Sequence, residues 1–449
     1  MDGPDPVTKP RAGDARAVMA VLAAMTLVAI DGGMVSVALP TIARSFAIAP
    51  AEAVSVVTSY QLAVVLALLP CAHLAGRVGQ RSLFTCGIAL FAGSSLCSAI
   101  APSLELMIAA RFIQGVGGAA IMALGIAMLR ANLAAPRLHS AIGWNAMTVA
   151  GCGAVGPLLA ALTLETAGWR MIFLPAVPVA LVSIYCARAF PRTAPGPAGE
   201  GLASLACYLS GAILLVLAIT SAGQRPWLAA SFAAGSIVPI AALVLIDRKH
   251  AAPLVPFDLL RRAPLRMGAI ASICCFTAQS AGFLGLIFRI EANPVGGIFT
   301  GAIVASLWPL GAITAASLAA QLERRFSYGT LCTVGGSLLA AGLGMAAVIP
   351  SQAGLALLSL YAFLCGMGFG TFQVPNNRNL LLGARPDRSA AAGAVQATSR
   401  LAGQTAGSSL VALLLASSGP VAPRLAMAMA SFFALAAALV ARRAAHVTA

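Results

Sequence analysis

The sequence has few charged residues for its length. Of 449 residues, 9% are charged and 60% are hydrophobic, whereas a soluble globular protein has about 25% charged and about 45–50% apolar residues. A soluble fold of this size could not cover its surface with so few charges, but a bilayer removes that need. The composition therefore excludes a set of soluble domains and indicates a protein that lies almost entirely in a membrane.

Residue types that mark binding or catalytic sites are also scarce. Only Lys9 and Lys249 of the 28 basic residues are lysines, and the basic residues form no patch, which argues against a nucleic-acid partner. The ten cysteines form no CxxC pair and the four histidines are dispersed, so we expect no metal site and no cofactor. Because no nucleotide-binding loop is present either, the sequence does not predict an enzyme, and any energy that the protein uses would have to come from an ion gradient or from the substrate's own gradient.

Long apolar runs fill most of the chain. A membrane-spanning helix needs about 20 apolar residues, and fourteen runs of this kind can be placed. We therefore expect an all-α polytopic membrane protein. The predicted spans lie near residues 18–39, 53–74, 83–101, 106–129, 140–163, 169–187, 202–221, 228–246, 267–288, 296–318, 330–349, 354–377, 389–415 and 424–441.

The basic residues are sorted between the loops. If both ends of the chain face the cytoplasm, twenty basic residues lie on that side and five on the other, as the positive-inside rule requires. Residues 1–17 are polar and resemble no signal peptide, so the first apolar run is expected to stay as a helix. We expect a multi-pass protein of the cell (inner, cytoplasmic) membrane with both termini in the cytoplasm.

A weak internal repeat relates residues that are 250 positions apart. The identities cover two separate loops and are Gly79/Gly329, Pro136/Pro386, Ala141/Ala391, Gly143/Gly393, Thr148/Thr398 and Gly153/Gly403. The predicted units are a cytoplasmic leader (1–17), an N-terminal six-helix bundle (18–190), a two-helix insert with a cytoplasmic linker (191–266), a C-terminal six-helix bundle (267–441) and a cytoplasmic tail (442–449). Two parallel repeats around a central site are the architecture of a rocking transporter.

Asp31 is the only carboxylate that lies well inside an apolar run. It is about 12 Å, and Arg111 about 8 Å, from the outer ends of their spans, so the two side chains can meet in the outer half of the membrane. The arginine favours the ionised aspartate and desolvation favours the neutral acid, so such a site can load and release a proton. We expect Asp31 and Arg111 to act in proton coupling; a structural hydrogen bond between helices is the alternative.

Five motifs, in order along the chain, resemble those of one family. They are DGGMVSVALPTIARSF from Asp31, RFIQGVGG from Arg111, GCGAVGP from Gly151, GWRMIFLPAVP from Gly168 and GAVQATSRLAGQTAG from Gly393. The sequence is therefore similar to the fourteen-helix drug:proton antiporter branch of the major facilitator superfamily. The resemblance implies proton coupling at Asp31 and Arg111 and the export of amphipathic, often cationic compounds.

Two of the resembling segments carry further expected roles. In the antiporter motif, small residues let helices approach closely and bend; they are Gly151, Gly153, Gly156 and Pro157. The cytoplasmic loop between the second and third spans keeps Arg77, Gly79 and Arg81 of the family's gating loop, but it has Gly76 where the family has an aspartate. The inner gate is therefore expected to differ from that of the family.

These observations predict a proton-coupled exporter of small amphipathic, cationic or drug-like compounds that works by alternating access as a monomer in the bilayer. The candidate substrate contacts in a central cavity are Gln114, Gln279, Gln373, Asn376, Asn377, Arg400, Tyr60 and Trp308. One alternative is a dedicated exporter of a single metabolite, toxin or siderophore; another is a transport-incompetent sensor or scaffold. Arg289 and Glu291, near the outer end of the ninth span, are expected to pair with each other at the membrane surface.

Overall fold

The computed structural model describes residues 12–191, 202–221, 225–247, 257–292, 297–349, 354–383 and 389–448. Within these ranges every regular element is a helix. Parts of the predicted leader (1–11) and of the predicted linker (192–201 and 248–256) lie outside the described residues. Helices satisfy their own backbone hydrogen bonds, as a segment in hydrocarbon must, so the helical class follows from the apolar composition.

The first group of helices, which we call the N-terminal bundle, runs from α1 to α7. Its elements are α1 (Ala12–Phe46), α2 (Pro50–Ala53), α3 (Ser55–Val78), α4 (Gln80–Ala99), α5 (Leu104–Asn132), α6 (Ala135–Thr166), the 3₁₀ turn η1 (Trp169–Phe173), α7 (Ala176–Cys186) and the 3₁₀ turn η2 (Ala187–Ala189). Helix α1 packs against α6 and α7, and α5 packs against α3 and α4.

The second group, the C-terminal bundle, repeats this packing. Its elements are α11 (Ala263–Glu291), α12 (Ile298–Leu322), α13 (Tyr328–Val348), α14 (Leu355–Leu382), α15 (Ser389–Ser418), the 3₁₀ turn η4 (Gly419–Val421) and α16 (Ala422–Thr448). Helix α11 packs against α15 and α16, and α14 packs against α12 and α13. Since an offset of 250 residues takes α1, α5 and α6 to α11, α14 and α15, the packing follows the repeat in the sequence.

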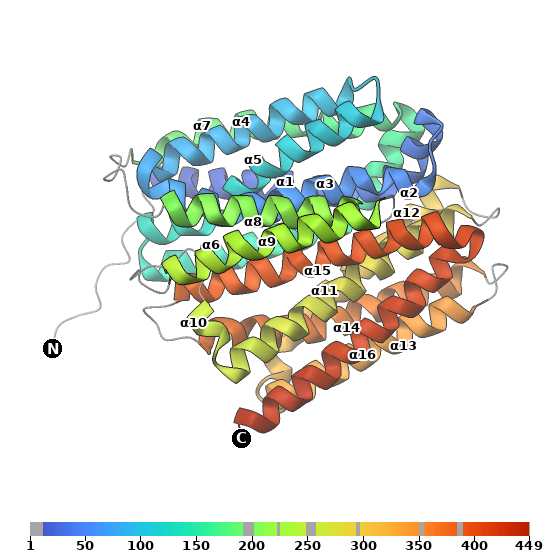
Figure 1. The fold of residues 1–449 in the computed structure, drawn as a ribbon. Helices are drawn as coiled ribbons and strands as arrows, with labels where there is room; N and C mark the ends of the chain where they lie inside the picture. Colours follow the sequence, from blue (N-terminus) through green and yellow to red (C-terminus); the bar gives the residue numbers. More distant parts are fainter. Residues whose placement is uncertain are drawn as a thin grey trace.

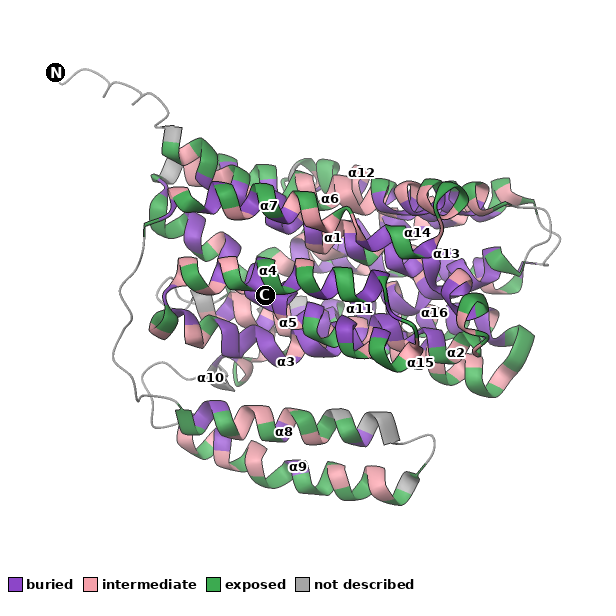
Figure 2. Cartoon of the chain, turned by 90° about the horizontal axis from the view of Figure 1, so that it is seen from above, coloured by how far each residue is buried: buried purple, intermediate pink, exposed green. Residues whose placement is uncertain are grey.

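In the sequence between the two bundles, α8 (Leu202–Ser221) and α9 (Pro226–Asp247) form a separate hairpin. Figure 2 shows this hairpin at one edge of the molecule, with many exposed residues. The hydroxyl of Tyr208 in α8 donates a hydrogen bond of 3.0 Å to the backbone carbonyl of Val65 in α3. The hairpin is therefore attached to the N-terminal bundle, and the short helix α10 (Phe257–Leu260) then leads into α11.

Twelve helical stretches of the described residues are long and apolar enough to cross a membrane. One of them, Ala391–Ala444, contains both α15 and α16, and α8 contributes only a shorter apolar stretch, Leu202–Leu215. The prediction of an all-helical, multi-pass membrane protein is confirmed. The count of fourteen spans stays a prediction, because these criteria give twelve.

The two bundles lie side by side, and α1 begins at the same end of the molecule at which α16 ends (Figure 1). We call this end the terminal side and the opposite end the far side. One apolar cluster joins the bundles at the far side and includes Leu39 of α1 and Phe288 of α11. On the terminal side, Phe84 belongs to a cluster of the N-terminal bundle that takes in Leu401 of α15, and Leu265 belongs to another in the C-terminal bundle. The bundles therefore share a core at the far side, and Leu401 also joins α15 to the apolar cluster of the N-terminal bundle.

Candidate functional site

Asp31, Arg111 and Gln114 form a buried polar cluster inside the N-terminal bundle. Arg111 Nη1 donates to both carboxylate oxygens of Asp31, at 2.9 and 2.8 Å. Gln114 Nε2 donates to Asp31 Oδ1 at 2.9 Å, and Gln114 Oε1 accepts from Arg111 Nη1 at 2.6 Å. The side chains of Asp31 and Arg111 are 8% and 1% exposed. We call this pair the interior ion pair, and it is almost completely removed from water.

The sequence positions explain how this cluster assembles. Arg111 and Gln114 are three residues apart on α5, so their side chains lie on the same face of the helix, and α5 packs beside α1, which carries Asp31. Arg111 Nε donates to the backbone carbonyl of Val56 at 3.2 Å, and its guanidinium lies 4.7 Å from the ring centroid of Tyr60. The position of the arginine is therefore fixed at three points. Asp31 and Gln114 bond Nη1, the carbonyl of Val56 bonds Nε, and the ring of Tyr60 lies against the guanidinium.

A small cavity of about 30 Å³ lies beside Asp31. Residues of α1, α4 and the η1–α7 segment line it, among them Thr26, Ser95 and Ile172. A cavity of this size has room for about one water molecule. The interior carboxylate therefore borders a site from which a single water molecule could exchange a proton with it.

The glycines of the antiporter motif on α6 have different surroundings. A Cβ atom at Gly156 would lie 3.3 Å from the Cα of Gly33, two residues after Asp31 on α1. A Cβ at Gly153 would lie 3.7 Å from Pro309 of α12, in the other bundle, whereas nothing lies within 4 Å of a Cβ at Gly151. The motif therefore places α6 against the helix that carries Asp31 and also against the C-terminal bundle.

The three predicted gating-loop residues lie around the turn between α3 and α4. Gly79 has a φ of 90°, a conformation that favours glycine because it has no Cβ. Arg77 is in the last turn of α3, and Arg81 Nη1 donates to the backbone carbonyl of Phe190 at 2.9 Å. Arg81 therefore ties the start of α4 to the end of the N-terminal bundle's last helical turn.

Several side chains predicted to line a central cavity instead have structural partners. Gln114 belongs to the cluster of Asp31 and Arg111, where its amide is already hydrogen-bonded. Asn376 of α14 donates to Ser272 Oγ at 2.7 Å and accepts from the hydroxyl of Tyr328 at 3.1 Å. Trp308 of α12 is buried in the shared apolar cluster. In this structure the three side chains therefore contact neighbouring helices, and their role as substrate contacts stays a prediction.

The other cavity candidates are more accessible or lie between the bundles. Asn377 accepts a hydrogen bond of 3.1 Å from Gln396, while Gln279 and Gln373 are half-buried. Tyr60 packs on Arg111, and Arg400 is half-buried on α15. These candidates could not be ranked from the sequence alone, because burial and hydrogen bonding depend on helices far apart in the chain.

The expected pairing of Arg289 with Glu291 is wrong. Glu291, at the end of α11, forms an ion pair with Arg44 near the end of α1, while Arg289 donates to the backbone carbonyls of Ala346 and Ile349 at the end of α13. The reason is geometric, since helix neighbours two positions apart point to different faces. We call Arg44–Glu291 the far-side ion pair.

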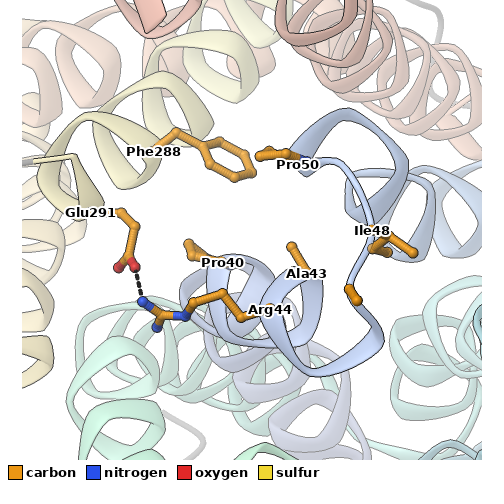
Figure 3. Close-up of a pocket in the computed structure, with 8 residues that line it drawn as sticks. Pro40, Ala43, Arg44, Ile48, Pro50, Phe288 and Glu291 are labelled. Carbon is orange, nitrogen blue, oxygen red and sulfur yellow. Dashed lines mark hydrogen bonds and ion pairs between the residues drawn. The ribbon is translucent and has the colours of Figure 1, made fainter. Parts of the chain in front are cut away.

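The far-side ion pair joins the two bundles beside a cavity of about 300 Å³. Figure 3 shows Arg44 and Glu291 pointing toward each other, with Pro40, Phe288 and Pro50 on the surrounding wall. Apart from the two charged side chains the lining is apolar. This contact could not be predicted from the sequence, because the partners are 247 residues apart.

Comparison with known proteins agrees with this architecture. The family model of the Major Facilitator Superfamily matches residues 21–408. The chain is 32% identical, over 94% of each chain, to the uncharacterized transporter YebQ of Escherichia coli. It is 29% identical to the multidrug efflux pump LfrA of Mycolicibacterium smegmatis, over 89% of this chain and 80% of LfrA.

A solved structure has the same fold at low sequence identity. The crystal structure of a POT family transporter in complex with 5-aminolevulinic acid has a TM-score of 0.74 and 14% identity, over 97% of this chain and 96% of that chain. The family match confirms the resemblance seen in the five motifs, and the efflux relative is consistent with the drug:proton antiporter branch. The chain belongs to the major facilitator superfamily and is a membrane transporter, not an enzyme.

Proposed function

We propose that this protein is a proton-coupled secondary transporter that exports small amphipathic compounds by alternating access. The observation that carries the proposal is the cluster of Asp31, Arg111 and Gln114. It is the one place in the described residues where a carboxylate lies deep in the membrane region, and the carboxylate is held there by an arginine. Intramembrane carboxylates are costly, and they mark ion and proton pathways in many transporters.

Proton coupling would follow from the hydrogen bonds of Asp31. The ionised carboxylate accepts from Arg111 and Gln114. Protonation removes the charge that holds the arginine, so Arg111 then interacts mainly with Gln114 Oε1 and the carbonyl of Val56. The loaded and unloaded states of Asp31 therefore favour different positions of α1 relative to α5, which is the coupling that an antiporter needs.

Alternating access would come from rocking of the two bundles, which we assign to residues 18–190 and 267–441. The bundles share a core and an ion pair at the far side, so the present arrangement is closed there. With the termini in the cytoplasm of the cell membrane, as the loop charges favour, this closed far side would be the outer side. The gating-loop residues Arg77, Gly79 and Arg81 would then act at the cytoplasmic side.

A relative supports the export of small compounds, whereas the pairing of Asp31 gives less support to the idea that these compounds are cationic. LfrA is named a multidrug efflux pump, which favours export of several small compounds. The further expectation that they are cationic has less support, because the interior carboxylate of Asp31 is already paired with Arg111. A dedicated exporter of a single metabolite, toxin or siderophore stays as the second candidate. The half-buried polar side chains of Gln279, Gln373 and Asn377 could contact one specific substrate as well as several different ones.

Efflux from proteoliposomes tests this proposal. Vesicles are loaded with a panel of dyes and diluted into an acidic medium, so that protons flow inward and the substrate leaves. We expect faster release of several dyes than from protein-free vesicles, and loss of the difference when an ionophore collapses the pH gradient. If no dye leaves, the broad exporter is contradicted and the dedicated exporter is favoured.

A further inference from the structure

Arg400 of α15 is a second arginine in the membrane interior, and the described residues offer it no partner. Its Nε atom is buried without a hydrogen bond, and no hydrogen bond or ion pair joins its side chain to any described residue. Arg111 shows the contrast, since its guanidinium has a carboxylate, an amide and a carbonyl. The side chain of Arg400 is half-buried, so an oxyanion that arrives from outside could bond the N–H groups of this guanidinium that no protein group occupies.

The location of Arg400 is the boundary between the two bundles. The next residue, Leu401, packs into the apolar cluster of the N-terminal bundle, which also contains Tyr60. Tyr60 is on α3, which packs directly against α15, the helix that carries Arg400. The Tyr60 hydroxyl is also buried without a hydrogen-bond partner. One hydroxyl and one guanidinium, on facing helices of opposite bundles, thus lack a hydrogen-bond partner among the described residues.

The charges inside the helix bundles indicate the charge of a ligand that could bind at Arg400. Asp31 is the only described carboxylate in the middle of a helix, and Arg111 neutralises it. The other carboxylates whose side chains are described lie at or beside helix ends: Asp14, Glu52, Glu105, Glu165, Asp247, Glu291 and Glu323. The uncompensated interior charge is therefore positive. A guanidinium with free N–H groups binds a carboxylate or another oxyanion through paired, charge-assisted hydrogen bonds.

We propose that Arg400 and Tyr60 form an anion-binding subsite, and that the exported compounds carry an acidic group such as a carboxylate or sulfonate. This inference rests on the proposed export function. It replaces the cationic substrate with an amphipathic acid, whose apolar part would lie along the neighbouring apolar walls of α3 and α15. Tyr60 would link the subsite to proton coupling, because its ring lies on the guanidinium of Arg111.

The test uses three dyes with one apolar scaffold and a permanent charge difference: a sulfonate, a neutral amide and a quaternary ammonium. Permanent charges prevent the pH gradient from moving the dyes by itself. In acid-driven efflux from proteoliposomes, we expect the wild type to release the sulfonate fastest. Arg400→Gln should lower sulfonate efflux by about 10- to 100-fold, the value of a charge-assisted hydrogen bond, and should leave the efflux of the neutral dye unchanged. Arg400→Lys should recover part of the sulfonate efflux.

The matched control is Arg378→Gln on α14, which removes an arginine that is exposed and paired with Glu323. This variant should keep sulfonate efflux at the wild-type rate. Faster efflux of the quaternary ammonium than of the sulfonate by the wild type would overturn the anion-binding subsite while leaving the proposed export function intact. An equal loss of all three dyes in Arg400→Gln would also overturn it, since that result indicates a packing role. No acid-driven efflux of any dye would overturn the broad export function together with this inference.

Discussion

The interior ion pair Asp31–Arg111 and the far-side ion pair Arg44–Glu291 each join two helices, but they differ in burial and in what they connect. Asp31 and Arg111 are 8% and 1% exposed and both belong to the N-terminal bundle. Arg44 and Glu291 are 61% and 36% exposed and belong to different bundles. A buried pair strongly resists the loss of one partner, whereas an exposed pair contributes little and is screened by salt.

The comparison separates two roles that an ion pair can have in a transporter. The interior ion pair does not cross the boundary between the bundles, so rocking need not break it, and protonation is the event that would change it. The far-side ion pair does cross that boundary, so it must break whenever the far side opens. Its weakness suits that task, because a strong contact there would hold the protein closed.

The largest effect is expected when the interior ion pair loses its arginine. Arg111→Leu leaves the carboxylate of Asp31 buried without a counter-charge, which costs about 3–5 kcal/mol of stability. The cost should shrink as the pH falls, because protonation removes the buried charge. Thermal unfolding in detergent at several pH values measures both effects. The double variant Asp31→Asn/Arg111→Leu should be more stable than Arg111→Leu alone; equal or lower stability would show that the pair does not act as a unit.

An intermediate effect is expected from crowding the helix that carries Asp31. Gly156→Leu on α6 forces a side chain against Gly33 of α1, and overpacking of this kind costs about 1–3 kcal/mol. Because α1 must shift, acid-driven efflux should fall as well. Gly151→Leu is the control on the same helix, since nothing lies within 4 Å of its Cβ position. Equal damage from both variants would argue against a specific contact between α1 and α6.

The smallest effect is expected at the far-side ion pair. Glu291→Gln should change stability by less than about 1 kcal/mol, and the change should disappear at high salt. Its main consequence should be a shift toward the far-side-open state of up to about fivefold, measured by labelling of a cysteine introduced at Ala43 in the cavity wall. The exchange variant Arg44→Glu/Glu291→Arg should restore wild-type labelling. Unchanged labelling in Glu291→Gln would show that this pair does not hold the far side closed.

The interior ion pair could be predicted from the sequence, but the far-side ion pair could not. Asp31 and Arg111 could be paired in advance, because depth in the membrane follows from position in an apolar run and both lie in the same half of the chain. The partner of Glu291 could not, since Arg44 reaches it only through the packing of α1 against α11. Asn376 looked like a cavity residue for the same reason, and Ser272 and Tyr328 bury it only once α11, α13 and α14 are in place.

The central claim is that Asp31 carries the transported proton, and Asp31→Asn tests it most directly. Asparagine can still accept a hydrogen bond from Arg111 but cannot exchange a proton. In proteoliposomes under an inward pH gradient, we predict that this variant no longer drives uphill efflux, while it still exchanges labelled for unlabelled substrate at equal pH. Uphill, proton-dependent efflux by Asp31→Asn at the wild-type rate would contradict the account.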